Sequence, residues 1–249
     1  MLGAQKRGPC LILGILQART SSTRLPGKVL KPLLDKPMLA RQIERLKRCR
    51  NLDRLIVATS TERSDDAVVE VAQQEGAPVF RGSLEDVLDR FYQAAKAHGS
   101  SHVVRLTADC PLTDPTLIDD VVQLAIEHNC DFASNDFVRS YPRGLDVEVM
   151  TISTLETLWH DTSNHQDREH VTPLVYAHPE RFKIGSVEIE IDLSALRWTV
   201  DYQTDFDFVT RVYQALYPAN PEFGMDDILR HLILNGEVRI FDRTGPDGC

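Results

Sequence analysis

The sequence predicts an α/β protein with a mostly parallel sheet between helices and a small antiparallel excursion. Apolar runs alternate with amphipathic segments of helical spacing over about the first 130 residues. Beyond Cys130, segments that alternate apolar and polar residues indicate half-exposed strands. With 249 residues, 42% of them hydrophobic and 26% charged, the chain can bury one large core. We therefore expect a single domain over residues 1–249, with the excursion at about 136–200.

The elements of the first half are predicted from apolar periodicity and end signals. The clearest helix covers 83–99, because Ser83 and Asp86 predict a capping box at its start and Gly99 follows its end. Another helix, over 114–129, has an acidic first turn, which the helix dipole favours. Strands are expected at 10–17, 53–60, 77–82 and 102–109, and helices at 37–49, 64–76, 83–99 and 114–129.

The second half mixes alternating segments with helices of the usual apolar spacing. No repeat, low-complexity tract or linker interrupts it, which favours one compact domain. Strands are expected at 145–153, 182–191 and 196–201, and helices at 166–178, 204–217 and 225–235.

Composition and charge exclude several classes of partner. The net charge of −9 argues against a protein that coats nucleic acid. No apolar run is long enough to span a bilayer, and no separate apolar leader precedes the first strand, so we expect a cytoplasmic protein without a membrane partner. The cysteines lack any C-x-x-C spacing, which favours free thiols over a disulfide framework or a zinc site. They are Cys10, Cys49, Cys110, Cys130 and Cys249.

A basic segment follows the first predicted strand. Residues 17–50 include ten Lys or Arg and two acidic residues, so a local basic pocket lies on an acidic body, which suits a small polyanion. The loop "QARTSSTRLPGKVL" is not a Walker A motif, because Ser22 and Val29 stand where that motif needs Gly and Ser or Thr. Gly14 is isolated, so a G-x-G-x-x-G dinucleotide motif is also excluded.

Carboxylates follow two other predicted strands. Asp109 ends the strand 102–109, and Asp201 ends the strand 196–201. Ligands of open parallel sheets bind beyond the carboxyl ends of the strands, so we expect both carboxylates to lie near the basic loop. Cations for phosphate oxygens and carboxylates for a hard metal are the groups that bind a nucleoside triphosphate with Mg²⁺.

Six segments carry a resemblance to a known family: "QARTSSTRLPGKVL", "VFRGSLEDVLDRFY", "RLTADCPLTDP", "YPRGLDVEV", "DREHVTP" and "WTVDYQTDF". In this order they closely resemble the cytidylyltransferase family of sugar nucleotidyltransferases. They match best the spore-coat polysaccharide (SpsF-type) branch, which is related to the CMP-KDO and CMP-sialic acid synthetases. The resemblance covers most of the chain and implies a Rossmann-like sheet of the nucleotide-diphospho-sugar transferase type.

The resemblance implies roles for residues of the nucleotide site. Lys28, Arg19 and Asp109 would be catalytic, and Asp109 and Asp201 would bind Mg²⁺. Two candidate base contacts have ordinary alternatives, because Ser83 also serves as an N-cap and Arg90 could be an exposed helix residue. The full nucleotide-binding set is Gln17, Ala18, Arg19, Ser22, Arg24, Lys28, Arg81, Ser83, Arg90, Ala108 and Asp109.

The acceptor would bind under "YPRGLDVEV" and "DREHVTP". Asp146 and Glu148 would accept hydrogen bonds from sugar hydroxyls, whereas three basic side chains would meet an acid group. An exposed strand face with a surface Arg168–Glu169 pair is the alternative interpretation. The substrate-binding set is Arg143, Asp146, Glu148, Arg168, Glu169 and His170.

The implied reaction transfers CMP from CTP to an acidic sugar or similar acceptor and releases pyrophosphate, in the synthesis of cell-surface polysaccharide or glycan precursors. A homodimer is implied, with the excursion at 136–200 as its dimerisation or sugar-binding part. Two alternatives stay open: a metal-dependent glycosyltransferase and a non-catalytic nucleotide-sugar-binding protein. The first usually carries a D-x-D triplet, but Asp205-Phe206-Asp207 is expected to begin a helix that Thr204 caps.

Overall fold

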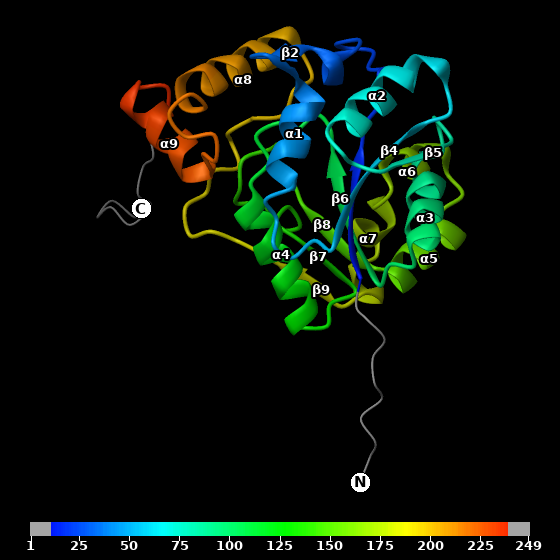
Figure 1. Cartoon of the computed structure of the whole chain (residues 1–249). Helices are drawn as coiled ribbons and strands as arrows, with labels where there is room; N and C mark the ends of the chain where they lie inside the picture. The colour runs from blue at the N-terminus through cyan, green and yellow to red at the C-terminus, as the bar shows by residue number, and fades with distance from the viewer. Residues whose placement is uncertain (1–10, 239–249) are drawn as a thin grey trace.

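The computed structural model describes residues 11–238, which form a central mixed sheet with helices on both faces (Figure 1). The seven strands are ordered β5-β4-β1-β6-β8-β7-β9. All neighbours are parallel except β8, which is antiparallel to β6 and β7. A separate two-stranded antiparallel sheet joins β2 (Pro32–Leu33) and β3 (Lys36–Pro37). The expected fold class is confirmed. The seven strands are β1 (Ile12–Gln17), β4 (Arg54–Ser60), β5 (Val79–Gly82), β6 (His102–Thr107), β7 (Phe132–Ser134), β8 (Glu148–Thr151) and β9 (Ile184–Ser186).

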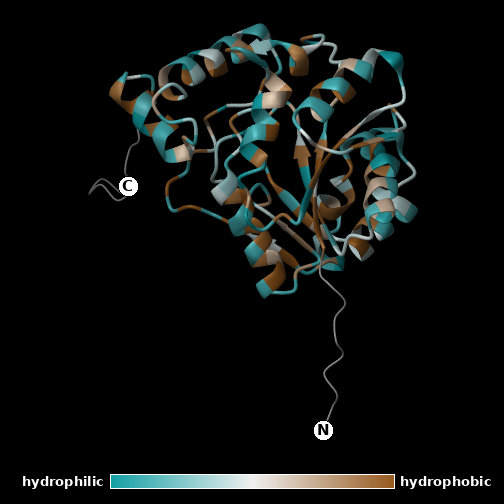
Figure 2. Ribbon diagram, in the orientation of Figure 1, coloured by the Kyte–Doolittle hydropathy of each residue, from teal (hydrophilic) through white to brown (hydrophobic). Residues whose placement is uncertain are grey.

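The helices form two layers because strand side chains alternate between the faces. Leu16 of β1 packs in the core that includes α1, α2, α4, α8 and α9. Leu13 and Ile15 of the same strand pack on the other face, with α3, α5 and α7. Figure 2 shows the hydrophobic residues concentrated on the central strands between these layers. The helices are α1 (Met38–Leu46), α2 (Asp66–Gln74), α3 (Val87–His98), α4 (Pro115–Glu127), α5 (Ile152–Asp161), α6 (His165–His170), α7 (Pro173–Ala177), α8 (Gln203–Leu216) and α9 (Met225–Leu234).

In the first half the predicted elements are all present with boundaries that differ by a few residues, and the largest difference is at one helix start. Helix α3 begins at Val87, so the prediction of a helix start at Ser83 was wrong. Asp86 is the N-cap and accepts a hydrogen bond from the Asp89 amide at 2.9 Å. Ser83 instead accepts from the Asp86 amide at 3.0 Å, which closes a separate turn before the helix. The predicted end at Gly99 is confirmed, since its φ of 61° is left-handed.

The second half departs further from the predictions. The helix expected over 166–178 is broken into α6 and α7 at Val171, whose φ is 72°. The strand expected at 182–191 is reduced to β9 because the chain after it bonds to Ser140: the Ile189 amide donates to the Ser140 hydroxyl at 2.9 Å. The segment 196–201 makes only one isolated bridge, between Arg197 and Arg143. Strand β7 and helix α5 were not predicted.

Two further predictions concern membrane-spanning helices and the state of the cysteines. No helix in the part of the chain that the structure describes is long and apolar enough to cross a membrane. Cys49, Cys110 and Cys130 are free thiols. Cys10 and Cys249 lie outside the described residues, as does the first residue of the strand expected at 10–17.

Candidate active site

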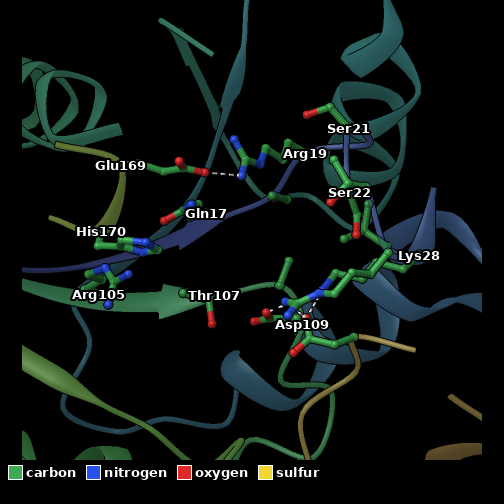
Figure 3. A pocket seen from close by; sticks show the side chains of 16 residues that line it. Gln17, Arg19, Ser21, Ser22, Lys28, Arg105, Thr107, Asp109, Glu169 and His170 are labelled. Atoms are coloured by element: carbon green, nitrogen blue, oxygen red, sulfur yellow. Dashed lines mark hydrogen bonds and ion pairs between the residues drawn. The ribbon is translucent and has the colours of Figure 1, made fainter. Parts of the chain in front are cut away.

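A cleft of about 390 Å³ opens at the carboxyl ends of β1 and β6, between the basic loop and helix α6 (Figure 3). This volume is in the range of small-molecule sites. The cleft brings together most of the residues expected around the nucleotide phosphates and the metal, and two of those expected around the acceptor. It is lined by Gln17, Ala18, Arg19, Ser21, Ser22, Thr23, Arg24, Lys28, Val29, Arg105, Thr107, Ala108, Asp109, Glu169, His170 and Asp201.

The basic loop after β1 is fixed by its own backbone. The Thr20 carbonyl accepts hydrogen bonds from the amides of Ser22 at 2.9 Å and Gly27 at 3.0 Å. Gly27 has a left-handed φ of 67° and precedes the short 3₁₀ helix η1 (Lys28–Leu30). These hydrogen bonds fold the loop around Thr20 and so fix the position of Lys28, the first residue of η1.

Asp65 attaches this loop to the neighbouring strand, a role that the sequence did not reveal. Its fully buried carboxylate accepts from the Thr20 amide at 2.8 Å and the Thr20 hydroxyl at 2.7 Å. It also accepts from the Ser60 hydroxyl, at the end of β4. Burial raises the pKa of Asp65, but the hydrogen bonds from Ser60 and Thr20 outweigh it and lower the pKa overall. Its partner Thr20 is 45 residues away, so no local pattern points to it.

We expect Asp65→Asn to loosen the loop, because an amide accepts fewer of these hydrogen bonds and cannot carry the charge. Charged hydrogen bonds contribute about 1.5–3 kcal/mol, so a loss of unfolding free energy of that order is expected, with weaker binding of the nucleoside triphosphate that the sequence predicts at this loop. Chemical denaturation and calorimetry measure the two effects. Glu70→Gln, which changes an exposed carboxylate on the adjoining helix α2, is the control. Unchanged nucleotide affinity in the Asp65 variant would contradict this role.

The two expected metal carboxylates lie around one ammonium group. Lys28 Nζ is 3.1 Å from Asp201 Oδ1 and 3.4 Å from Asp109 Oδ2, and it donates to the Val200 carbonyl at 2.6 Å. The Val200 amide donates to the Asp109 carbonyl at 2.8 Å, so the segment carrying Asp201 is bonded to the end of β6. The predicted proximity of Lys28, Asp109 and Asp201 is confirmed.

Asp201 forms ion pairs with more cations than Asp109 does. Arg24 donates to its Oδ1 and Arg197 to its Oδ2, both at 2.6 Å. Burial raises the pKa of Asp201, but the hydrogen bond from Arg197 and the charge of Lys28 outweigh it, so the pKa is lowered. Asp109 pairs only with Lys28 among the ion pairs of residues 11–238, and 30% of its side chain is exposed.

This donor set fits a magnesium ion that substrate helps to bind. Among the described residues, no group of three or more His, Cys, Asp or Glu could hold a metal alone. Mg²⁺ commonly binds through one or two carboxylates together with waters and substrate phosphates. Asp109 and Asp201 match that requirement, because both carboxylates contact a single cation, Lys28 Nζ, and so lie close enough to share one ion.

Helix α6 closes the cleft from the other side. Glu169 accepts from Arg19 Nη2 at 2.6 Å, and the hydrogen bond from Arg19 lowers the pKa of Glu169. The helix ends at His170, which lines the cleft and is followed by the left-handed Val171. A β-branched residue in this conformation is strained, and the fully buried Val171 side chain keeps it there.

Arg105, on β6, is a cleft residue that the sequence did not reveal. Its Nη1 donates to Glu148 Oε2 at 2.5 Å, and the two residues are opposite each other on β6 and β8. Glu148 was expected to bind the acceptor, but it is buried behind Arg105 and does not line the cleft. Pairing across two strands depends on their register, which the sequence did not predict.

The candidate base contacts do not line the cleft. Arg81 donates to the Ser60 and Glu62 carbonyls, both at 2.8 Å, and pairs with Asp66. Arg90 is fully buried, which corrects the alternative of an exposed helix residue, and its Nη1 donates to the Ser83 carbonyl. Burial lowers the pKa of Arg90 to about 10.

Three expected acceptor contacts have other partners. Arg168 donates to Asp86 at 2.9 Å and to the carbonyls of Trp159 and Thr162, so it stabilises the end of α5. Asp146 pairs with Arg139 at 2.5 Å. The side chain of Arg143 does not line the cleft, and its backbone bonds to the segment around Arg197. The surface Arg168–Glu169 pair is not formed, because each residue pairs elsewhere.

The sheet, the basic loop and the two carboxylates beside Lys28 define the protein as a nucleotidyltransferase. The family model "Cytidylyltransferase" matches residues 13–220. The chain belongs to the cytidylyltransferase family.

Individual relatives agree with this family. The chain is 34% identical over 210 residues to the spore coat polysaccharide biosynthesis protein SpsF of Bacillus subtilis, covering 82% of this chain and 86% of that protein. A cytidylyltransferase of Leptospira borgpetersenii has a similar structure, with a TM-score of 0.88, 33% identity and coverage of 94% of this chain and 100% of the other. A CMP-KDO synthetase solved with CTP shares the fold, with a TM-score of 0.66 and 17% identity over 83% of this chain and 100% of that one.

Proposed function

We propose that the protein transfers CMP from CTP to an acidic sugar or a similar small acceptor and releases pyrophosphate. The observation that carries the proposal is the placement of Lys28 between Asp109 and Asp201 in a cleft rimmed by Arg19 and Arg24. The CTP bound to the structurally similar CMP-KDO synthetase supports the choice of nucleotide. The name of the SpsF relative supports a place in polysaccharide precursor synthesis.

In this reaction an acceptor hydroxyl oxygen forms a bond to the α-phosphorus of CTP as it loses its proton, and the bond to the pyrophosphate oxygen breaks. Arg19, Arg24 and Lys28 bind the phosphate oxygens and stabilise the charge that grows on pyrophosphate. Ser22 and the amides of the loop orient the phosphates for in-line attack. No covalent enzyme intermediate is needed.

Asp109 and Asp201 would hold Mg²⁺ in the reactive complex. When bound, the ion supplies positive charge that polarises the phosphate and fixes its orientation. The surrounding cations are paired with carboxylates in the structure: Arg24 and Lys28 with Asp201, and Arg19 with Glu169. Nucleotide phosphates would replace these carboxylates as partners of the cations and so release Asp201 for the metal. We therefore infer that CTP and Mg²⁺ bind together.

The remaining inferences concern the setting of the reaction. We infer a cytoplasmic homodimer in which the excursion at 136–200 contributes to dimerisation or to the acceptor site. A single domain over 1–249 accords with two cores that share one sheet in the described part. Both statements stay predictions, and sedimentation of the purified protein tests the dimer.

The position of the triplet Asp205-Phe206-Asp207 argues against the glycosyltransferase alternative. Asp205 Oδ2 accepts from the amides of Asp201 at 2.8 Å and Tyr202 at 2.9 Å, so it caps the start of α8. Asp207 accepts from Gln203 at 2.6 Å. The triplet begins a helix as predicted, but Thr204 is not its cap, since α8 begins at Gln203. Neither aspartate lines the cleft.

We expect the protein to bind CTP at least about tenfold more tightly than ATP or GTP, equivalent to about 1.4 kcal/mol. The reason is that members of this family use a pyrimidine, whose carbonyl, ring nitrogen and amine differ from those of purines. Calorimetry in the presence of Mg²⁺ measures the three affinities. Equal affinity for ATP and CTP would contradict the cytidine assignment, and pyrophosphate release from CTP with a panel of acidic sugars tests the transfer itself.

A further inference from the structure

One end of the cleft is distinct from the phosphate-binding end. Figure 3 places Gln17, Arg105 and His170 together at one end and Lys28 and Asp109 at the other. Arg105 lies two residues before Thr107 on β6, so both side chains point to the same face of the sheet. Two residues of strand span about 6.6 Å, and Asp109 follows two residues later. The cleft therefore runs along β6 from Arg105 past Thr107 to Asp109, and all three residues line it.

The guanidinium of Arg105 is fixed from behind by a satisfied carboxylate. Glu148 accepts from Arg105 at 2.5 Å, from the Thr172 hydroxyl at 2.8 Å and from the Tyr176 hydroxyl at 2.9 Å. Two of these three donors are neutral hydroxyls, so Glu148 does not depend on Arg105 alone for its hydrogen bonds. Arg105 donates to Glu148 through one nitrogen, Nη1. Burial lowers the pKa of Arg105, but the charge of Glu148 outweighs it, so the group remains a cation.

Two buried polar atoms at this end have no hydrogen-bond partner within the described chain. They are Nε of Arg105, a donor, and Oε1 of Gln17, an acceptor. Buried polar groups in native proteins are nearly always paired, and an exception calls for an explanation such as a bound ligand, water or ion. Both side chains line the cleft, and their rotation toward a bound polar group would pair these two atoms.

The other arginines expected to meet an acid group are not available for it. Arg168 makes hydrogen bonds at the end of α5, and Arg143 does not line the cleft. Of the other arginines that line the cleft, Arg24 pairs with Asp201 and Arg19 pairs with Glu169, and both of these carboxylates line the cleft too. Arg105 is thus the cleft arginine whose carboxylate partner, Glu148, lies outside the cleft.

We propose that Arg105 binds the anionic group of the acceptor, a carboxylate or another oxyanion, with His170 and Gln17 beside it. This rests on the proposed transfer of CMP and names the charge that the acceptor must carry. The acceptor then lies beside β6, with its oxyanion at Arg105 and its attacking hydroxyl turned toward the nucleotide. Arg105 selects hydroxy acids over uncharged sugars of the same size.

The test compares acids with uncharged analogues in the pyrophosphate-release assay. The probes are 3-deoxy-manno-octulosonate, N-acetylneuraminate and 2-hydroxyethylphosphonate. Each carboxylate is paired with its methyl ester and the phosphonate with its dimethyl ester, so that every analogue is uncharged. With an accepted probe, Arg105→Gln is expected to raise the KM for the acid about 10- to 100-fold, because a charge-assisted hydrogen bond is lost. The KM for CTP stays within about twofold, and the preference for acid over ester falls toward one. The acid that wild-type protein prefers distinguishes a carboxylate from a phosphonate.

A second pair of variants separates binding from support of Glu148. Arg105→Gln leaves the buried Glu148 unpaired, so Glu148→Gln and the double variant are measured alongside, with thermal unfolding as the check on folding. If Arg105 binds the acceptor, the double variant keeps the high KM, whereas Glu148→Gln alone changes it little. If Arg105 only neutralises Glu148, the double variant regains the wild-type KM and the proposal fails. Arg181→Gln, which removes a partly exposed arginine outside the cleft, is the matched control.

The outcomes also separate this proposal from the proposed function. Pyrophosphate release with esters as efficient as with acids would overturn the role of Arg105 while leaving cytidylyl transfer established. CTP binding without pyrophosphate release from any probe or ester would contradict the proposed transfer, and the acceptor site at Arg105 with it.

Discussion

Replacing Asp109 or Asp201 by asparagine is expected to lower turnover by about 100- to 1000-fold, the cost of removing a group that stabilises charge in the transition state. Both carboxylates lie within reach of Lys28, and asparagine keeps their shape but removes the charge that a hard cation requires. If the two act through one ion, the double variant should lose little more than either single variant, and excess Mg²⁺ should partly rescue the single variants. Pyrophosphate release over a range of Mg²⁺ concentrations measures the turnover of the two single variants and of the double variant.

The structure predicts different effects of the two changes on stability. Asp201→Asn removes the carboxylate that pairs with Arg24 and leaves Lys28 with Asp109 and Arg197 with Asp205 as their remaining carboxylates, so this variant should unfold at a lower temperature than wild type. Asp109 is partly exposed and pairs only with Lys28 within the described chain, so its variant should keep a near-normal melting temperature. Asp207→Asn, on the exposed side of α8, should change neither property. Additive losses of turnover without dependence on Mg²⁺ would contradict a shared metal site.

Lys28→Ala is expected to lower turnover by about 100- to 1000-fold, equivalent to about 2.7–4 kcal/mol of transition-state stabilisation. The residue is not an exposed loop lysine, since its side chain is 11% exposed and donates to the Val200 carbonyl and to Asp201. Its loss should therefore also lower the unfolding free energy by about 1–3 kcal/mol, because a buried acceptor and a buried carboxylate lose a partner.

Two comparisons separate these effects of Lys28. Turnover measured well below the melting temperature of the variant reports the chemistry, and denaturation reports the stability. Lys31→Ala removes a neighbouring charge that lies over the Phe206 ring, and it should leave turnover unchanged. Near-normal turnover in the Lys28 variant would remove Lys28 from the mechanism.

The sequence predicted the parts of the site that follow strong apolar strands. Gln17 and Asp109 were expected as the last residues of two strands, and the carboxyl ends of parallel strands meet at one edge of a sheet. The structure places both residues in the cleft at that edge. Asp65 and Arg105 could not be found in this way. Each works through a partner on another element, Thr20 for Asp65 and Glu148 for Arg105, and only the folded register brings these pairs together.

The second half was harder to predict because side chains there replace regular pairing. Ser140 bonds to the chain after β9 and ends that strand early, although the alternating pattern continues to Ile191. Val171 breaks a helix whose apolar spacing is continuous, and its strained conformation leaves no mark in the sequence. Thr151, which caps α5, and the helical spacing of Leu155 and Leu158 were available signals for that helix.

The contact between Lys28 and Asp201 has a consequence for the order of folding. The two residues are 173 positions apart in the chain, so the reactive cleft closes through a very long loop. While the protein is being synthesised, the basic loop and most of the sheet exist before Asp201 has emerged from the ribosome. Catalytic competence should therefore arise last, and local opening of the segment around Val200 should silence the enzyme while the sheet remains folded. Hydrogen exchange at the Val200 amide, which is bonded to Asp109, would report that opening directly.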